Sequence, residues 1–553
     1  MQTSTRDDNL LNRLLAQRLL FARRPSRPSL LDLPVPQPAD TKKTRIQVWR
    51  NHAFEPLLPI LEIYAAHSGW NPDFILGPYD DTLNFTGHQG CDLELLWIDP
   101  QRYKNGIAPG SFLEERIHSL RNISDSPILV VAMSPVMAED TPDISMIYRA
   151  DMETLCRSHD VKVSDERTAV LAGTRLGARA QLLAARELAC SWIPAITQPP
   201  IKAILLDLDE TLHRGVLSED GIQGIEVQPG HLSLQTRLKQ LRQSGVLLAL
   251  VSRNEREDVS ALFQKHADYV LSEEDFTCLE VSWGRKSEAI TRIAESMHIS
   301  TDAILFVDDN VGELAEAAIH HPAIRLVQAQ PDALETQCAI DHEPGIWRWN
   351  TSSASLQRSA DIKAGHQREA LAKTVTDPAR YLEALQTTLK IAVNEKQEIP
   401  RLTELCTRTN QFNLSLKRLN ELALERYMTS PDSSVVSVAL SDRLADSGII
   451  CVLVAVQRED AVHIEELCIS CRALGRQLER SIISAALTAL PYADNGRDIV
   501  FHVATSDRNM PARRFLEEFG LSLPVEGPVL TSFVYLKNLA VNPSIQIAHQ
   551  SQP

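Results

Sequence analysis

The sequence of 553 residues contains no apolar run of the roughly 18 residues that a membrane-spanning helix requires. It lacks the basic start and apolar core of a secretory signal, since Asp7 and Asp8 lie near its N-terminus. It also lacks an excess of positive charge, because its formal net charge is −16. No broad basic face is therefore expected for binding nucleic acid or an anionic membrane. These absences predict a cytoplasmic protein with neither nucleic acid nor a membrane span.

Cysteine spacing offers no metal framework. The nine cysteines are odd in number and irregularly spaced. The pair Cys468 and Cys471 reads C-x-x-C, but no second pair or histidine cluster completes a zinc site. Reduced thiols in a cytoplasmic protein are the simpler interpretation. No internal repeat is present, and a chain of this length is expected to form about two to four domains.

Alternating strand and helix patterns predict a first α/β unit at residues 43–198. Before it, residues 1–42 combine a basic amphipathic helix at 10–24 with a proline-rich linker at 25–40. That helix can pack, dimerise or dock. Within the first unit we predict strands at 45–49, 93–98 and 128–133, helices at 56–68 and 171–192, and a turn region at 77–81.

A second α/β unit is predicted at residues 199–340. Its apolar runs do not alternate, which is typical of parallel strands covered on both faces, and such sheets bind ligands at the carboxyl ends of their strands. The strands are expected at 203–208, 246–251 and 303–307, and the helices at 232–244, 255–266 and 287–297. A polar connector at 341–379, a third unit at 380–541 and a disordered tail at 542–553 are expected to follow. In the third unit we predict strands at 449–456 and 463–468 and a helix at 474–489.

Two carboxylates, one residue apart, follow the strand at 203–208 in the motif D-L-D-E-T. Asp207 can attack phosphorus as a nucleophile, and Asp209 can act as general acid and then as base. A bound Mg²⁺ would offset the repulsion between these carboxylates and a phosphate, and Thr211 can orient the groups by hydrogen bonds. Alone, however, the motif is also compatible with an acidic turn after a strand.

Three further features at the ends of strands or helices of this unit favour a phosphate site. Ser252 follows a strand, where its hydroxyl can bind phosphate. Lys286 lies at a helix start and can supply a fixed positive charge. Asp308 and Asp309 follow the strand at 303–307, where carboxylates can bind a metal.

The order of these motifs resembles that of the haloacid dehalogenase (HAD) superfamily of phosphotransferases, over about residues 200–330. The resemblance implies a HAD-like Rossmannoid domain with a parallel sheet and a Mg²⁺ cofactor. Asp309 is either a further metal ligand or an orienting residue. The other implied roles are nucleophile for Asp207, acid/base for Asp209, phosphate binding for Thr211, Ser252 and Lys286, and metal binding for Asp207, Asp209 and Asp308.

The surrounding residues resemble the FkbH-like subfamily, through D-L-D-E-T-L-H-R-G-V-L-S-E-D-G-I-Q-G-I at 207–225, W-G-R-K at 283–286 and F-V-D-D-N at 306–310. Such proteins are associated with taking a glyceryl unit from 1,3-bisphosphoglycerate, removing phosphate and loading the three-carbon acid onto an acyl carrier protein, as in polyketide biosynthesis. This chain departs from the subfamily at Glu210, where asparagine is common, and at His213-Arg214, where Trp-Gly is usual. We expect both departures to line the entrance and to bear on substrate identity.

The third unit resembles the GNAT-like acyltransferase part of longer FkbH-like proteins, through N-Q-F-N-L-S at 410–415, D-R-L-A-D-S-G at 442–448 and C-I-S-C-R-A-L-G-R-Q-L-E at 468–479. Arg472 and Gly475, at a helix start, can present amides to a pyrophosphate or a pantetheine phosphate. Gln477 stands where a second small residue is common. This favours a degenerate coenzyme A site, or one that reads the arm of a carrier protein.

The first unit resembles the SGNH-hydrolase-like part of the same proteins, through Trp97, Asp99 and G-T-R-L at 173–176. Arg50-Asn51-His52 stands where a hydrolase needs serine, and no histidine lies three residues after Asp165. A scaffold or carrier-docking role is therefore favoured over hydrolysis.

Thioester chemistry needs a thiol, and two cysteines are candidates for holding the acyl group. Cys471 lies beside Arg472, and Cys278 lies nearest in sequence to the phosphoryl site. Direct transfer to the carrier thiol is the alternative. For the whole chain, the hypotheses are a phosphatase/glyceryltransferase, a stand-alone phosphomonoesterase that acts on a small metabolite, and a non-catalytic carrier-docking protein.

Overall fold

Two compact units make up the chain, Met1–Glu295 with Ile299–Asn350, and Ser296–His298 with Thr351–Pro553. No helix among the described residues is long and apolar enough to cross a membrane. The computed structural model describes residues 2–33, 43–103, 108–136, 145–165, 172–350, 353–375, 378–409, 411–459, 461–474, 476–492, 498–506, 509–518, 521, 527–532 and 542–549.

The first sheet is wholly parallel, in the order β2-β1-β3-β4-β5. Neighbouring residues of β1 point to opposite faces, so Val48 packs with the helices α3 and α7 while Trp49 packs with α4. Helices on both faces explain the continuous apolar runs of the inner strands. The elements are β1 (Lys43–Arg50), α3 (Leu58–His67), β2 (Asn71–Tyr79), β3 (Leu93–Ile98), α4 (Pro109–Arg121), β4 (Ile128–Ala132), β5 (Ile147–Asp151), α5 (Met152–Ser158), α7 (Ala178–Glu187) and α8 (Pro194–Thr197).

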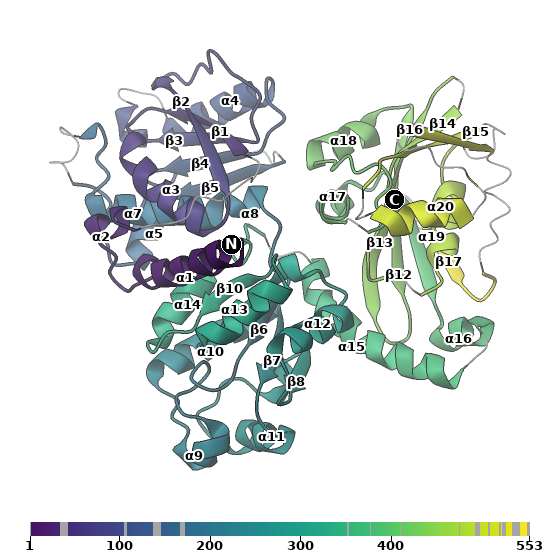
Figure 1. The fold of residues 1–553 in the computed structure, drawn as a ribbon. Coiled ribbons are helices and arrows are strands. Elements are labelled where there is room, and N and C mark those ends of the chain that lie inside the picture. Colours follow the sequence, from purple (N-terminus) through teal and green to yellow (C-terminus); the bar gives the residue numbers. More distant parts are fainter. Residues whose placement is uncertain are drawn as a thin grey trace. The chain divides into compact units, whose positions relative to one another are not determined.

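The second sheet is also wholly parallel, in the order β10-β9-β6-β7-β8 (Figure 1). Its first strand in sequence, β6, lies between β9 and β7, so the strand order reverses between β6 and β9. Open α/β sheets bind ligands at such a switch point, outside the carboxyl ends of the strands. The elements are β6 (Ala203–Leu206), α9 (Leu217–Gly224), α10 (Pro229–Gln243), β7 (Leu247–Ser252), α11 (Arg256–Lys265), β8 (Cys278–Val281), α12 (Lys286–Ser296), β9 (Ile304–Asp308), α13 (Val311–His320), β10 (Arg325–Gln328) and α14 (Ala333–Asp341).

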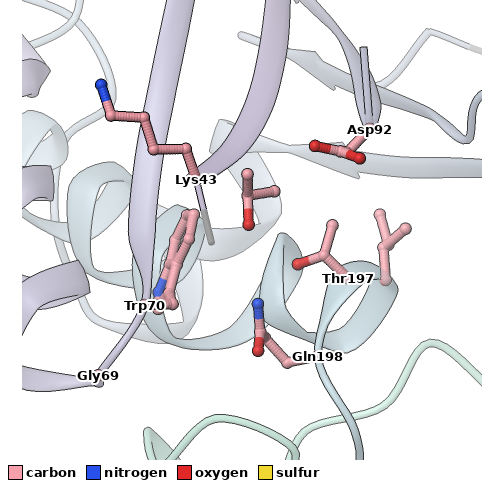
Figure 2. A pocket seen from close by; sticks show the side chains of 8 residues that line it. Lys43, Gly69, Trp70, Asp92, Thr197 and Gln198 are labelled. Carbon is pink, nitrogen blue, oxygen red and sulfur yellow. The ribbon is translucent and has the colours of Figure 1, made fainter. Parts of the chain in front are cut away.

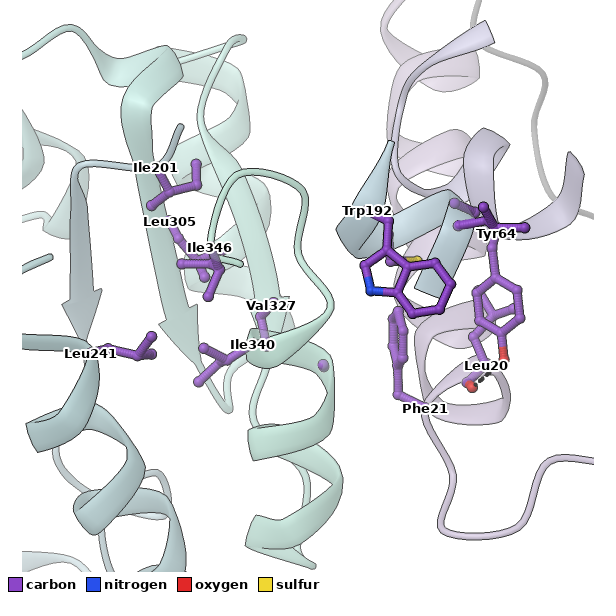
Figure 3. Close-up of a cluster of buried hydrophobic side chains, with 14 of the residues drawn as sticks. Leu20, Phe21, Tyr64, Trp192, Ile201, Leu241, Leu305, Val327, Ile340 and Ile346 are labelled. Carbon is purple, nitrogen blue, oxygen red and sulfur yellow. Dashed lines mark hydrogen bonds between the residues drawn. The ribbon is translucent and has the colours of Figure 1, made fainter. Parts of the chain in front are cut away.

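One continuous hydrophobic cluster joins the lobes that carry these two sheets. It includes Tyr64 and Trp192 of the first lobe and Ile340 and Ile346 of the second (Figure 3). The N-terminal helix α1 (Gln2–Leu20) contacts α3 of the first lobe and β10 and α13 of the second. Its Gln17 amide donates to the Gln328 carbonyl over 2.9 Å. Of the roles left open for this segment, packing within the chain is therefore the one observed.

The second compact unit, which contains the region predicted from the sequence as the third unit, has a mixed seven-stranded sheet. Its strand order is β16-β15-β14-β13-β12-β11-β17. Helices α17 and α18 pack on one face, and α19 and α20 pack on the other. The predicted α/β class, with two parallel sheets and a third α+β part, is confirmed. The elements are α15 (Ser353–Thr374), α16 (Pro378–Leu385), β11 (Thr388–Val393), α17 (Ile399–Arg408), α18 (Glu421–Thr429), β12 (Ser433–Ser441), β13 (Asp446–Gln457), β14 (Ala461–Ile469), α19 (Glu479–Thr488), β15 (Asp498–Val503), α20 (Met510–Glu518), β16 (Gly527–Ser532) and β17 (Gln546–His549).

Several local predictions were wrong. The turn expected at 77–81 overlaps strand β2, which runs through Gly77 to Tyr79 because it pairs with β1. The helix expected from residue 171 has its described α-helical part at α7 and continues as a π-turn at Leu188–Trp192. Helix α2 (Arg27–Leu31) occupies part of the expected linker, where it buries Leu30.

The segments predicted as a connector and as a disordered tail both contain regular structure. The polar connector contains the 22-residue helix α15, whose Arg368 forms an ion pair with Asp442 at 2.8 Å. The expected disordered tail contains β17, which pairs in parallel with β11 because the edge of that sheet offers free backbone groups.

Candidate functional site

Asp207 and Asp308 meet at the switch point of the second sheet. Asp207 directly follows β6, and Asp308 is the last residue of β9. The Asp207 amide donates to the Val307 carbonyl at 2.9 Å, which continues the pairing of the two strands. The strand register therefore brings together carboxylates that are a hundred positions apart in sequence.

Lys286, the first residue of α12, lies between these two carboxylates. Its Nζ is 2.7 Å from Asp207 Oδ1 and 2.7 Å from Asp308 Oδ2. All three side chains are buried. When both carboxyls are ionised, the three groups carry one negative charge in excess, which a bound metal cation can neutralise.

The pKa values of the three groups follow from burial and mutual attraction. Burial raises the pKa of Asp207 to about 8, with the Asp308 carboxylate adding to the rise and the Lys286 ammonium ion opposing it. Burial likewise raises the pKa of Asp308. For Lys286 burial acts in the opposite sense, but the two carboxylates outweigh it and raise its pKa. Removing the ammonium ion would therefore make ionisation of both carboxyls harder.

The Asp209 carboxylate is held by three hydrogen bonds. It accepts from the Leu217 amide at 3.0 Å, from His213 Nε2 at 3.2 Å and from Asn254 Nδ2 at 2.7 Å. Burial opposes its ionisation, but the bonds from His213, Leu217 and Asn254 outweigh burial and lower the pKa of Asp209. The two motif aspartates therefore differ in the direction of their pKa shifts: the pKa of Asp207 is raised and that of Asp209 is lowered.

His213 occupies a different place from the one expected. It is fully buried, with Nε2 facing Asp209 and Nδ1 within hydrogen-bond distance of the Tyr269 hydroxyl. The prediction that it lines the entrance was therefore wrong, because its ring fills the space behind Asp209. Arg214 is exposed, and its backbone pairs with Glu226. Glu210 has a positive φ of 52° and accepts a hydrogen bond from the Gly215 amide at 2.7 Å.

Thr211 and Ser252 are both buried, and Asn254 links Ser252 to Asp209. Asn254 Nδ2 donates to Ser252 Oγ at 3.0 Å and also reaches Asp209. Thr211 Oγ1 and Asn254 Oδ1 are buried and have no partner among the described residues. Such atoms are costly unless a ligand or water satisfies them. Sequence reasoning missed Asn254, although its place two residues after Ser252 offered a signal.

Three carboxylates of this site have the geometry of a cation site. Asp207, Asp308 and Asp309 offer oxygen atoms that all lie within 4.8 Å of one another. Burial raises the pKa of Asp309, although Lys286 opposes the rise. Hard oxygen donors of this kind fit Mg²⁺. The cluster contains Asp309, for which two roles were left open, and does not contain the carboxylate of Asp209.

The SGNH-like motifs of the first lobe also come together. Arg175 forms an ion pair with Asp99 at 2.8 Å, and the Asp99 amide donates to Asn51 Oδ1 at 2.7 Å. His52 Nδ1 lies 2.9 Å from Thr174 Oγ1, and burial lowers the pKa of His52 to about 4. These groups bind one another at the carboxyl edge of the first sheet.

The predicted residues of the second unit are only partly described. The Arg472 side chain is turned toward the Ser447 carbonyl at 3.3 Å, and burial lowers its pKa. Gly475 lies outside the described residues. Cys471 is partly exposed, as is Cys278 in the first unit.

An open pocket lies at the opposite, amino-terminal edge of the first sheet. It is lined by residues at or just before the starts of strands and at the end of α8, among them Lys43, Trp70, Asp92 and Gln198 (Figure 2). None of the residues predicted to carry chemistry lines it. It is therefore separate from the carboxylate site.

No family model matches the sequence, and no curated protein matches it. Among solved structures, the N-terminal part of BF1531 from Bacteroides fragilis, which contains a phosphatase domain complexed with Mg, is 16% identical with a TM-score of 0.46, covering 58% of this chain and 98% of its own. A putative HAD family hydrolase from Streptomyces avermitilis MA-4680 is 21% identical with a TM-score of 0.20, covering 26% of this chain and 93% of its own. The aminoglycoside acetyltransferase AAC(6')-Ib, in complex with coenzyme A, is 12% identical with a TM-score of 0.20, covering 27% of this chain and 98% of its own. Likenesses of this strength do not establish an activity.

Proposed function

We propose that the second lobe is a Mg²⁺-dependent phosphatase of the HAD type. The observation that carries the proposal is the bridge from Lys286 to Asp207 and Asp308, each at 2.7 Å, at the switch point of a parallel sheet. Asp309 completes an oxygen-donor set for the cation. Bound there, Mg²⁺ would reduce the repulsion between these carboxylates and a phosphate.

In this proposal an Asp207 carboxylate oxygen attacks phosphorus while the bond from phosphorus to the leaving oxygen breaks. A protonated Asp209 would donate to a leaving alkoxide. Its ionised form then accepts a proton from the water that attacks the phosphoaspartate. The lowered pKa of Asp209 suits the second of these tasks. Lys286, Thr211 and Ser252 would bind the phosphoryl oxygens.

We further propose that the substrate is 1,3-bisphosphoglycerate and that the glyceryl unit is loaded onto an acyl carrier protein. Asp207 would remove the C3 phosphate, whose leaving oxygen is an alkoxide. A thiol would attack the C1 carbonyl, forming a thioester as the C1 phosphate leaves. This part is supported by the resemblance of residues 207–225, 283–286 and 306–310 to the FkbH-like subfamily, and by the GNAT-like motifs of the second unit. The first lobe would serve as a scaffold or docking surface. Arg472 and Gly475 would read the carrier's arm, with Cys471 as a candidate acyl thiol.

A plain phosphomonoesterase is the second candidate. It is favoured by the fact that Asp207, Asp209, Lys286 and Asp308 all come from the second lobe. The residues proposed for phosphoryl chemistry therefore all belong to one lobe.

Two measurements on the full chain test these proposals. The first is phosphate release from 1,3-bisphosphoglycerate with Mg²⁺ or EDTA, comparing wild type, Asp207→Asn and the exposed control Asp268→Asn. We expect phosphate release to be lost in EDTA and in Asp207→Asn, and to be kept in Asp268→Asn. Release without Mg²⁺, or an active Asp207→Asn variant, would refute the phosphatase.

The second measurement is the intact mass of a candidate carrier protein after the same incubation. A gain of one glyceryl unit supports loading, and phosphate release without any gain favours the phosphomonoesterase.

A further inference from the structure

A cluster of chargeable side chains, which includes none of the proposed phosphatase residues, lies where the two lobes of the first unit join. Cys338 belongs to α14 and His342 follows that helix, whereas Arg186 and Glu187 end α7 of the other lobe. His342 Nδ1 lies 3.6 Å from Cys338 Sγ, and His342 Nε2 lies 2.9 Å from Glu187 Oε1. Arg186 Nη2 is 3.2 Å from the same Glu187 oxygen, and Arg186 Nη1 approaches Cys338 Sγ to 4.0 Å.

The geometry requires a doubly protonated His342 ring. Its Nδ1 lies 2.7 Å from the Cys338 carbonyl oxygen, which can only accept a hydrogen bond. Its Nε2 faces the Glu187 carboxylate, which also only accepts when ionised. Burial opposes ionisation of Glu187, but His342 and Arg186 outweigh it and lower the pKa of this carboxyl. With Glu187 ionised, both contacts need hydrogen on the ring nitrogens, which makes the ring an imidazolium ion. Phe21 stacks on it with an interplanar angle of 17°, which fixes its orientation.

The charges of this cluster balance only if the sulfur is ionised. His342 and Arg186 contribute two positive charges and Glu187 one negative charge. His159 Nε2, 3.0 Å from Arg186 Nη2, accepts from that guanidinium and therefore adds no charge. A neutral thiol would thus leave a net positive charge in the cluster. A thiolate at Cys338 brings the sum to zero. Asp341 is the opposing group beside the sulfur, but its carboxylate forms an ion pair with Arg237 at 2.6 Å.

The pKa directions agree with this geometry. Burial opposes ionisation of Cys338, but His342 and Arg186 outweigh it and lower the pKa of the thiol. Burial and Arg186 disfavour the charged form of His342, but Glu187 and Cys338 outweigh both and raise its pKa to about 10. Cationic neighbours are the usual cause of a reactive cysteine in proteins.

We propose that Cys338 is held as a thiolate and is a covalent modification site for small electrophiles, with hydroperoxides as the natural class of reactant. The thiolate sulfur attacks one peroxide oxygen, the O–O bond breaks, and a sulfenic acid forms as the other oxygen leaves as hydroxide or alkoxide and takes a proton. The sulfur gives up two electrons to the peroxide. Cys338 is intermediate in exposure as a residue, and the proposed reaction requires that a small reagent reach its sulfur.

Cys91 provides a matched control within the chain. It is also partly exposed, but burial and the neighbouring Glu94 carboxylate raise the pKa of its thiol to about 12. The two cysteines therefore differ mainly in the sign of the charge that faces the sulfur. A difference between the two cysteines in the pH dependence of alkylation therefore reports the charge that faces each sulfur.

The test is the rate of alkylation by iodoacetamide from pH 5.5 to 9.5 in the folded full chain, read for each cysteine by peptide mass spectrometry. Limited access lowers the rate equally at every pH, so the midpoint of each profile reports the ionisation of that thiol. For Cys338 we expect a midpoint well below the value of about 8.5 for a free thiol, and a rate at pH 6.5 at least about tenfold that of Cys91. A Cys338 midpoint at or above that of a free thiol, or no alkylation of Cys338 at any pH, would overturn the proposal.

Two further measurements separate the charge cluster from mere exposure. His342→Gln is expected to move the Cys338 midpoint upward, whereas His320→Gln, at an exposed histidine of α13, leaves it unchanged. An unchanged midpoint in a folded His342→Gln variant would refute the imidazolium as the cause. Treatment with hydroperoxide and then dimedone should label Cys338 and not Cys91. Labelling of Cys91 and not Cys338 would refute the proposed site. If His342→Gln does not fold, the wild-type profile still decides the proposal.

Discussion

Replacing Lys286 by methionine removes the one cation between two buried carboxylates and keeps a side chain of similar length. Breaking a buried ion pair by deleting one partner costs about 3–5 kcal/mol. Without the ammonium ion, the pKa values of Asp207 and Asp308 rise further, since Lys286 opposes that rise in the wild type. We therefore expect Lys286→Met to lower the free energy of unfolding by about 3–5 kcal/mol at pH 8.

The loss of unfolding free energy in Lys286→Met should be smaller at low pH than at high pH. A carboxyl whose pKa is raised on folding binds a proton that the unfolded chain releases, so stability falls as pH rises from the unfolded pKa of about 4 toward the folded value, by up to about 1.4 kcal/mol per pH unit for each proton. In Lys286→Met both carboxyls are held protonated to higher pH. At pH 5 the deficit should therefore shrink to about 1–2 kcal/mol. Mg²⁺, which can replace the lost cation, should recover more stability in the variant than in the wild type at pH 8.

Tryptophan fluorescence during urea unfolding is a suitable assay, because all seven tryptophans lie before residue 351 and report on the first unit. Lys265→Met, at an exposed lysine of α11, is the control and should change stability little. A Lys286→Met deficit that is the same at pH 5 and pH 8 would refute the reasoning. It would mean that lost packing, and not the unpaired carboxylates, causes the destabilisation.

Three other predictions rest on individual contacts. Asp209→Asn should reduce hydrolysis at least about a hundredfold, measured by phosphate release, because the base is lost; near-normal release would contradict that role. His213→Gln removes a hydrogen bond and a charge partner that lower the pKa of Asp209, so the acidic limb of the kcat–pH profile should move to higher pH, and an unmoved limb would argue against the contact. Gly345→Ala should destabilise the first unit by about 2–4 kcal/mol in urea unfolding. Gly345 has a φ of +88°, and a Cβ there would lie 2.7 Å from the Pro199 oxygen and 2.8 Å from the Ile201 nitrogen. An unchanged urea midpoint would contradict this prediction.

The inner strands were predictable because burial on both faces leaves an unbroken apolar run. The strand expected at 93–98 matches β3 residue for residue. The missed strand β2 contains Pro72, Gly77 and Pro78, which are typical of turns. It lies at the edge of the sheet, where proline is tolerated because half of the backbone groups need no partner strand. Strand pairing, which the local sequence does not contain, decided the structure of this segment.

The order of motifs at the candidate site was visible in the sequence because each motif follows a strand or begins a helix. The sequence did not show which side chains each of the two aspartates would face. Asp207 and Asp209 are two residues apart, yet one faces Lys286 and the other faces His213 and Asn254. The strand ends at Leu206 and the chain turns at once, so the usual alternation of side chains does not apply. Only the fold assigns each carboxylate its partners.

The cysteines carry the same argument further. Sequence proximity to an arginine singled out Cys471, whose neighbour Arg472 also donates to the Ser447 carbonyl. For Cys338 the nearer cation is four residues along the chain, but Arg186 comes from the other lobe, 152 residues away. The charge that ionises a thiol such as Cys338 is a sum over groups that only folding brings together. A reactive cysteine is therefore better sought among the ion pairs that join two lobes than among the residues adjacent in sequence.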